Sequence, residues 1–229
     1  MKQYYYLLVD LACIIVPFLC SFYPKHAFYK EWKSFFKANF LVALIFLIWD
    51  YFFTYWEVWG FNPEYLIKLN IADLPLEEIL FFICIPYACV FTYFAMQYLF
   101  PLKRPSKTVI WFNRALYMVF LLLGLFYFDK WYTATTFLGT FAFLLFLDLK
   151  KIDLQHYYTS YFLILPFFFM SNGLLTGSFI ERPIVWYNDA ENLGLRIGTI
   201  PVEDTIYGLL LIFMNIYLFN FFGIRAANK

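Results

Sequence analysis

Four carboxylic acids stand out because they come as two adjacent pairs, each between a proline-containing turn and a long apolar stretch. The acids are Glu77, Glu78, Glu203 and Asp204. Ionisable side chains at membrane depth are costly to bury, and by default they mark functional sites. Positioned carboxyl groups can donate and accept protons, so the four residues are candidates for acid–base chemistry.

Pro75 and Pro201 predict that each acid pair opens a helix, because proline suits the first helical position. Glu77 and Glu203 would then be third in their helices, with the second acids one step deeper. Acids in a first helical turn also interact favourably with the helix dipole, by roughly 0.3–1 kcal/mol, without any catalytic role. The repetition of the pair favours function. Adjacent helical residues point about 100° apart, so the members of a pair suit different roles; which one donates the proton is left open.

The composition excludes an ordinary soluble domain. Hydrophobic residues make up 63% of the chain and charged residues 14%, against about 25% charged in a typical soluble protein, and mean hydropathy is +0.66. The apolar residues form continuous blocks of spanning length, which indicates helices rather than barrel strands. We predict an all-α, polytopic membrane protein with about seven transmembrane helices, at 4–23, 35–56, 76–99, 109–128, 131–149, 157–178 and 202–222.

The basic residues predict the orientation of these spans. Twelve of the seventeen Lys and Arg lie in the connections between spans one and two, three and four, and five and six, or in the C-terminal tail. The positive-inside rule then places the N-terminus outside and the C-terminus in the cytoplasm. Both acid pairs would lie at the outer ends of their helices.

The acid-bearing helices are spans three and seven, which run in the same direction because they are four spans apart. We therefore predict two parallel repeats, residues 1–100 and 131–229, with 101–130 as a connecting span. Such repeats commonly form a site at their interface.

Aromatic residues make up 26% of the chain. Clusters at 4–6, 51–59 and 131–132 are expected to form an aromatic belt at the outer interface. Aromatic faces also stabilise cations. Acid, base, aromatic walls and a membrane setting together suggest protonation of a carbon–carbon double bond in a lipid-soluble polyene.

The segments LPLEEILFFI at 74–83 and IPVED at 200–204 resemble the two signature segments of the integral-membrane lycopene cyclases of bacteria and archaea. The runs WGFNPE at 59–64 and RPIVWY at 182–187 are similar to that family as well. A related unit heads fungal bifunctional lycopene cyclase/phytoene synthases. The chain resembles the form in which two halves are fused.

The resemblance implies an intramolecular lyase or isomerase of carotenoid biosynthesis that cyclises the ψ-ends of lycopene to β-ionone rings, in the inner membrane of a prokaryote. It makes Glu77, Glu78, Glu203 and Asp204 the catalytic residues. The substrate would be a lipid-soluble carotenoid, and contact with other carotenoid-pathway enzymes is a further expectation. The sequence has no G-x-G-x-x-G segment and no cysteines at metal-ligand spacing, so we expect no cofactor and no metal. Nothing points to a nucleic-acid partner.

Other polar residues inside the spans are secondary candidates. Asp10 and Asp50 have either a supporting role near the acid pairs or a structural one. Four amide side chains are expected to form interhelical hydrogen bonds: Asn39, Gln97, Asn172 and Asn215.

Several alternatives stay open on the sequence. They are a proton-coupled transporter using the carboxylates, a carotenoid-binding scaffold, and a cyclase acting on a C50 carotenoid. Ring type and the number of ends cyclised are also open. A retinal photoreceptor is disfavoured because span 202–222 has no lysine. A prenyltransferase is disfavoured because Asp-rich motifs are lacking.

Overall fold

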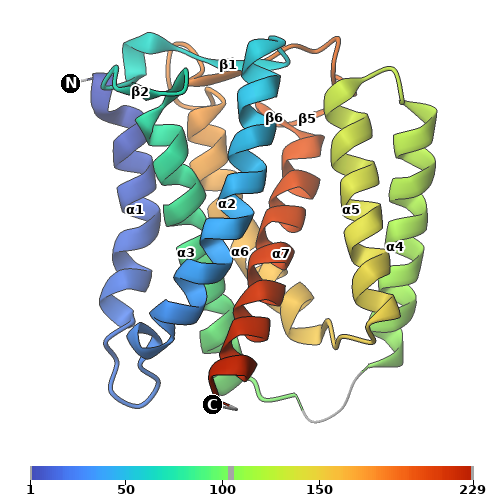
Figure 1. The fold of residues 1–229 in the computed structure, drawn as a ribbon. Helices are drawn as coiled ribbons and strands as arrows, with labels where there is room; N and C mark the ends of the chain where they lie inside the picture. Colours follow the sequence, from blue (N-terminus) through green and yellow to red (C-terminus); the bar gives the residue numbers. More distant parts are fainter. Residues whose placement is uncertain (1, 103–105, 228–229) are drawn as a thin grey trace.

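The computed structural model describes the backbone of residues 2–102 and 106–227 and the side chains up to residue 223. Within these ranges, seven helices are long and apolar enough to cross a membrane, which confirms the predicted all-α, polytopic fold (Figure 1). They are α1 (Tyr5–Cys20), α2 (Trp32–Tyr55), α3 (Leu76–Leu99), α4 (Lys107–Phe126), α5 (Trp131–Leu149), α6 (Gln155–Leu175) and α7 (Val202–Ala227).

Most helix boundaries fall close to the predicted ones. The bounds of α3 and α5 coincide with the prediction, whereas α2 begins three residues earlier and α1 ends three residues earlier. Helix α6 begins two residues earlier, at Gln155, whose N–H donates to the Asp153 carboxylate at 3.1 Å in the turn before the helix.

Short strands and turns form a layer over the end of the bundle that carries the acids (Figure 1). Three antiparallel two-stranded pairs make up this layer: β1 (Trp59–Phe61) with β4 (Val185–Tyr187), β2 (Asn70–Ile71) with β3 (Leu74–Pro75), and β5 (Arg196–Ile197) with β6 (Ile200–Pro201). Three 3-10 helices complete the elements: η1 (Lys2–Tyr4), η2 (Phe28–Glu31) and η3 (Pro63–Tyr65). These strands are only two or three residues long, and they were not predicted from the sequence.

Backbone hydrogen bonds in the first half of this layer recur in the second half, between residues whose numbers are higher by 126. Residues 69 and 195 are one such equivalent pair. The N–H of Leu76 donates to the Leu69 carbonyl, and the N–H of Val202 donates to the Leu195 carbonyl. The β2–β3 and β5–β6 hairpins match in the same way. In the β1–β4 pair, Gly60 is the central residue of one strand and lies opposite Trp186, the central residue of the other. The numbers of these two residues also differ by 126. An antiparallel pair centred on equivalent residues is what a two-fold relation between the halves produces.

Helix packing shows the same relation. Helix α1 packs on α3 as α5 packs on α7, and α2 packs on α7 as α6 packs on α3. Helices α3 and α7 also contact each other, so the two acid-bearing helices lie at the centre of the bundle. Helix α4 packs against α5. The division at residues 100 and 130 itself stays a prediction.

The prolines lie one position outside the helices, not at the first helical position as predicted. Pro75 has extended backbone angles (φ −59°, ψ 144°) and pairs with Asn70 across the β2–β3 hairpin. Pro201 pairs with Arg196 in the same way. Because the hairpins take up both prolines, Glu77 and Glu203 are second in their helices, and Glu78 and Asp204 are third.

The connections that hold most of the basic residues lie at the end of the bundle opposite the strands (Figure 1). Four of the twelve residues used for the orientation lie outside the described side chains: Lys103, Arg104, Arg225 and Lys229. The separation of the acid end from the basic end is therefore a property of the fold.

The buried amide side chains only partly follow the expectation. Asn39 of α2 donates to the Phe82 carbonyl of α3 at 2.9 Å and to Asn215 Oδ1 of α7 at 3.3 Å, which confirms an interhelical role. Gln97 instead bonds to Tyr93 in its own helix, because the two residues lie one turn apart. Asn172 does join two helices, and its partner is an acid of the second pair.

Candidate active site

The first acid of each pair holds the preceding loop. One oxygen of Glu77 accepts a hydrogen bond from the N–H of Ile67 at 2.6 Å, and Glu203 accepts the equivalent bond from Leu193 at 2.7 Å. Glu203 also accepts a bond from the Thr133 hydroxyl at 2.7 Å. Both carboxyl groups are fully buried. These contacts fix the loops against the helix starts.

The second acid of each pair meets a tyrosine from the start of another helix. The Tyr6 hydroxyl, in the second residue of α1, donates to Glu78. The Tyr132 hydroxyl, in the second residue of α5, donates to Asp204 at 2.5 Å. A buried carboxyl needs such donors, because leaving it without hydrogen bonds is costly. The two halves thus build the same contact twice.

Glu78 and Asp204 line one cavity, which has a volume of about 650 Å³. Glu77 and Glu203 are not among its lining residues in the described part of the chain. The rest of the wall is mostly apolar and comes from α1, α3, α6 and α7, with Tyr132 of α5 and strands β1 and β4 at the acid end. The structure therefore brings together one acid from each pair, and directs the other two into the loops.

Hydrogen bonding is unequal at the two acids of the cavity. Asp204 accepts three bonds: from Tyr132 at one oxygen, and from Asn172 at 2.7 Å and Tyr187 at 2.9 Å at the other. Glu78 accepts one, from Tyr6, among the residues described. The positions equivalent to Asn172 and Tyr187 are Phe46 and Phe61, which have no polar group to donate. Sequence divergence between the halves has made the two carboxyl groups chemically different.

Tyr187 lies on strand β4, outside the membrane-spanning helices. Burial, and then the neighbouring Asp204 carboxylate, raise the pKa of its phenol well above the usual value. The phenol therefore stays protonated, and it can act as a lasting hydrogen-bond donor to Asp204.

Aromatic rings surround the acids. The Tyr132 and Tyr187 rings stack with centroids 5.8 Å apart, and Trp59 meets Tyr132 edge-on at 5.1 Å. Tyr207 lies 6.0 Å from Trp59, and its buried hydroxyl has no hydrogen-bond partner among the described residues. All four rings line the cavity. Rings so placed can stabilise positive charge that develops beside them.

Asp10 and Asp50 are fully buried, but neither is among the lining residues of the cavity. Asp50 accepts a hydrogen bond from Trp59 Nε1 at 2.5 Å, so it holds an indole that does line the cavity. Both carboxylate oxygens of Asp10 lack a hydrogen-bond partner in the described part of the chain. A supporting role for either residue stays a prediction.

The tyrosines of the site were not predicted from the sequence, because their clusters are typical of an aromatic belt at the membrane interface. Tyr6 and Tyr132 are 1% and 2% exposed and point inward, whereas their neighbours Tyr4 and Trp131 are exposed and suit a belt. Trp59 is buried as well. A signal was present: Tyr6 and Tyr132 differ by 126, the same spacing that separates the acid pairs.

Replacing Glu77 tests its structural role. Glu77→Ala leaves the Ile67 N–H without its partner and should lower the free energy of unfolding by roughly 1–3 kcal/mol, measured by thermal unfolding in detergent. Glu77→Gln keeps an acceptor oxygen and should lose less. Glu64→Ala, at an exposed acid of the same loop, is the control and should change little. Equal stability of Glu77→Ala and the control would contradict the role.

Comparison with known proteins agrees with this geometry. The model of the lycopene cyclase family matches residues 3–96 and 129–222, so the same family unit occurs twice in the chain. Each match contains one acid pair and its tyrosine, and the region between them corresponds to α4 and its flanks. No curated protein and no solved structure matches the chain. With both halves matched over most of its length, the chain belongs to the lycopene cyclase family.

Proposed function

We propose that this protein cyclises the ψ-ends of lycopene to β-ionone rings by proton transfer, without redox change. The observation that carries the proposal is the placement of Glu78 and Asp204 in the wall of one apolar, aromatic cavity. Membership of the family supports a lycopene cyclase. We infer the roles of individual residues from the contacts described above, and the β ring type from the resemblance of the acid-bearing segments to this family.

The reaction needs one proton donated and one removed for each ring. A carboxylic acid protonates the terminal double bond of the ψ-end at its inner carbon, which leaves a tertiary cation at the end carbon. The double bond four carbons further along attacks this cation and closes the six-membered ring, and the positive charge moves to a ring carbon. A carboxylate then removes the proton from the ring carbon that formed the new bond, and the double bond between this carbon and the cationic carbon completes the β ring. Atoms and electrons balance without an oxidant or reductant.

We assign the donor role to Glu78 and the base role to Asp204. Three donors to Asp204 favour its ionised form, because hydrogen bonds to a carboxylate stabilise the charge. Glu78 has one oxygen bonded to Tyr6 and a second with no partner among the described residues, so that oxygen can carry a proton facing the cavity. Unequal surroundings of two carboxyl groups commonly separate acid from base.

The rings around the acids suit the cation formed between these steps. Trp59, Tyr132, Tyr187 and Tyr207 present aromatic surfaces to the cavity, and cation–π attraction is stronger where water is excluded. Asp50 is a positioning residue here, because it orients the Trp59 indole. Glu77 and Glu203 are positioning residues as well, since they fix the loops that precede the catalytic helices.

We infer that the protein lies in the inner membrane of a prokaryote, with the acid end outside and the C-terminus in the cytoplasm. The distribution of Lys and Arg supports this orientation. A green fluorescent protein fused to the C-terminus should fluoresce in cells, because it folds in the cytoplasm, and alkaline phosphatase fused there should be inactive. The reverse pattern would invert the orientation.

Substitution of the two cavity acids tests the proposed roles. In a lycopene-accumulating host, the wild-type chain should convert lycopene to β-ring carotenoids, measured by chromatography. Glu78→Gln and Asp204→Asn should each lower the conversion about 100-fold or more, because general acid–base groups contribute 10²–10⁴ in rate. Both variants should still insert in the membrane.

Two further variants make this test sharper. Glu64→Gln should convert lycopene at the wild-type rate, and Glu77→Gln should retain more activity than Glu78→Gln. Equal losses at positions 77 and 78 would contradict the division between positioning and catalytic acids. Unchanged lycopene with well-expressed wild type would remove the cyclase proposal, and a proton-coupled uptake signal would favour a transporter.

The source of the transferred proton gives an independent prediction. Because a carboxylic acid exchanges its proton with water, conversion in D₂O should add one deuterium for each ring formed. Mass spectrometry of the product should show one extra mass unit in singly cyclised molecules and two in doubly cyclised ones. Product without deuterium would mean that the added proton does not come from an exchangeable group.

A further inference from the structure

The cavity reaches the lipid-facing surface between α1 and α6. Val16 of α1 and Phe167 and Met170 of α6 line it, yet these side chains are 63%, 67% and 69% exposed. Ala12 of α1 also lines the cavity and is exposed. Exposed apolar side chains in the middle of spanning helices face lipid tails. The cavity is therefore open sideways to the hydrocarbon of the bilayer.

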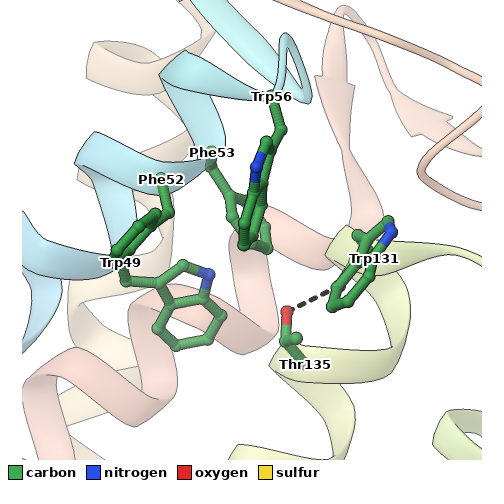
Figure 2. A pocket seen from close by; sticks show the side chains of 6 residues that line it. All are labelled: Trp49, Phe52, Phe53, Trp56, Trp131 and Thr135. Carbon is green, nitrogen blue, oxygen red and sulfur yellow. Dashed lines mark hydrogen bonds between the residues drawn. The ribbon is translucent and has the colours of Figure 1, made fainter.

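The equivalent gap in the other half lies between α5 and α2, and there the surface is different. Figure 2 shows a separate pocket lined by side chains of α2, by Trp56 directly after α2, and by side chains of α5. Its volume is about 260 Å³. It shares no lining residue with the larger cavity. Trp49 and Phe53 line the smaller pocket and separate it from the larger cavity. The ring centroids of Trp49 and Tyr207 are 5.1 Å apart, and those of Phe53 and Trp59 are 4.8 Å apart. Tyr207 and Trp59 line the other side.

One substitution, and one phenylalanine that lies differently in the two halves, explain why one gap is open and the other is closed. The position equivalent to Trp49 is Leu175, a smaller side chain that lines the large cavity. The position equivalent to Phe53 is Phe179, which is 78% exposed and lies outside the cavity. The wall built by α2 therefore has no counterpart on α6.

We propose that the gap between α1 and α6 is the mouth through which one end of the polyene enters, and that the rest of the substrate lies in this gap and in the bilayer during the reaction. This inference rests on the proposed cyclase function. The cavity follows α1 from Tyr6 to Pro17, which is about 16 Å at 1.5 Å per residue. That is roughly half of the 30 Å hydrocarbon thickness. The extended chain of a C40 polyene is longer than the cavity, so it cannot enter whole.

A mouth on one side has a consequence for a substrate with two reactive ends. The second ψ-end lies outside while the first one reacts, because Trp49 and Phe53 close the opposite gap. The two rings are therefore made in separate binding events. The singly cyclised molecule leaves the cavity, turns around in the bilayer and enters again.

Tryptophan substitutions in the two gaps test the position of the mouth. Ala12→Trp should lower the initial rate of lycopene conversion at least tenfold, because the indole fills the opening. Thr135→Trp, in the closed gap on α5, is the matched control and should stay within twofold of the wild type. Met170→Trp, from the opposite side of the mouth, repeats the test if Ala12→Trp does not insert. Wild-type rates in folded Ala12→Trp or Met170→Trp would overturn the proposal.

A time course with the purified wild-type protein in vesicles tests the order of events without a variant. The singly cyclised product should accumulate first, and the doubly cyclised product should appear after a lag. Adding excess unlabelled singly cyclised carotenoid should dilute the label in the doubly cyclised product formed from labelled lycopene. Doubly cyclised product without a lag and without dilution would overturn the proposal of separate binding events. If the wild-type protein leaves lycopene unchanged, the proposed function fails instead.

Discussion

A carboxyl group buried among hydrocarbon side chains needs hydrogen-bond donors, and the architecture of this protein follows from that need. Glu78 and Asp204 receive a tyrosine hydroxyl each, and both tyrosines come from the first turn of a neighbouring helix. The donors can reach the acids only if the helix starts lie at the same level of the membrane. The strand layer achieves this, because it ties the loops of both halves together at that level.

Duplication and divergence have contributed different things to the site. Duplication supplied two acids, two tyrosines and the matched backbone bonds that position them. Divergence then gave Asp204 two further donors, where the first half has phenylalanine. It also closed one side gap with Trp49, where the second half has Leu175. A symmetric frame thus holds a chamber with distinct acids and distinct sides, which a reaction with one donor and one acceptor requires.

Much of this arrangement could be predicted from the sequence. Long apolar blocks predicted the seven spans, and the repeated acids identified the helices at the centre of the bundle. The sequence also indicated that paired acids must point in different directions. Helical geometry alone could not tell which acid of each pair faces the cavity. That choice depends on the Ile67 and Leu193 N–H groups, which bind Glu77 and Glu203 and come from irregular loops.

The tyrosine partners were harder to predict for a physical reason. At the interface between lipid and water, an aromatic residue gains stability both by facing outward and by bonding to a buried acid. Tyr4 and Tyr6 belong to the same cluster, but Tyr4 is exposed and Tyr6 is buried. In the sequence, only the equivalent Tyr132 in the other half marks Tyr6 as the inward-facing residue, because spacing within one cluster does not show which tyrosine is buried.

Helix α4 has a role that follows from the number of membrane crossings in each half, not from the chemistry of the site. Each half crosses the membrane three times, so a direct fusion would insert the second half upside down relative to the first. One additional crossing restores a common direction, and α4 provides it while contributing no described side chain to the cavity wall. Two separate three-helix chains would need no such crossing. The sequence of α4 is therefore constrained by hydrophobicity and by its contact with α5, and it is free to diverge more than the helices that line the cavity.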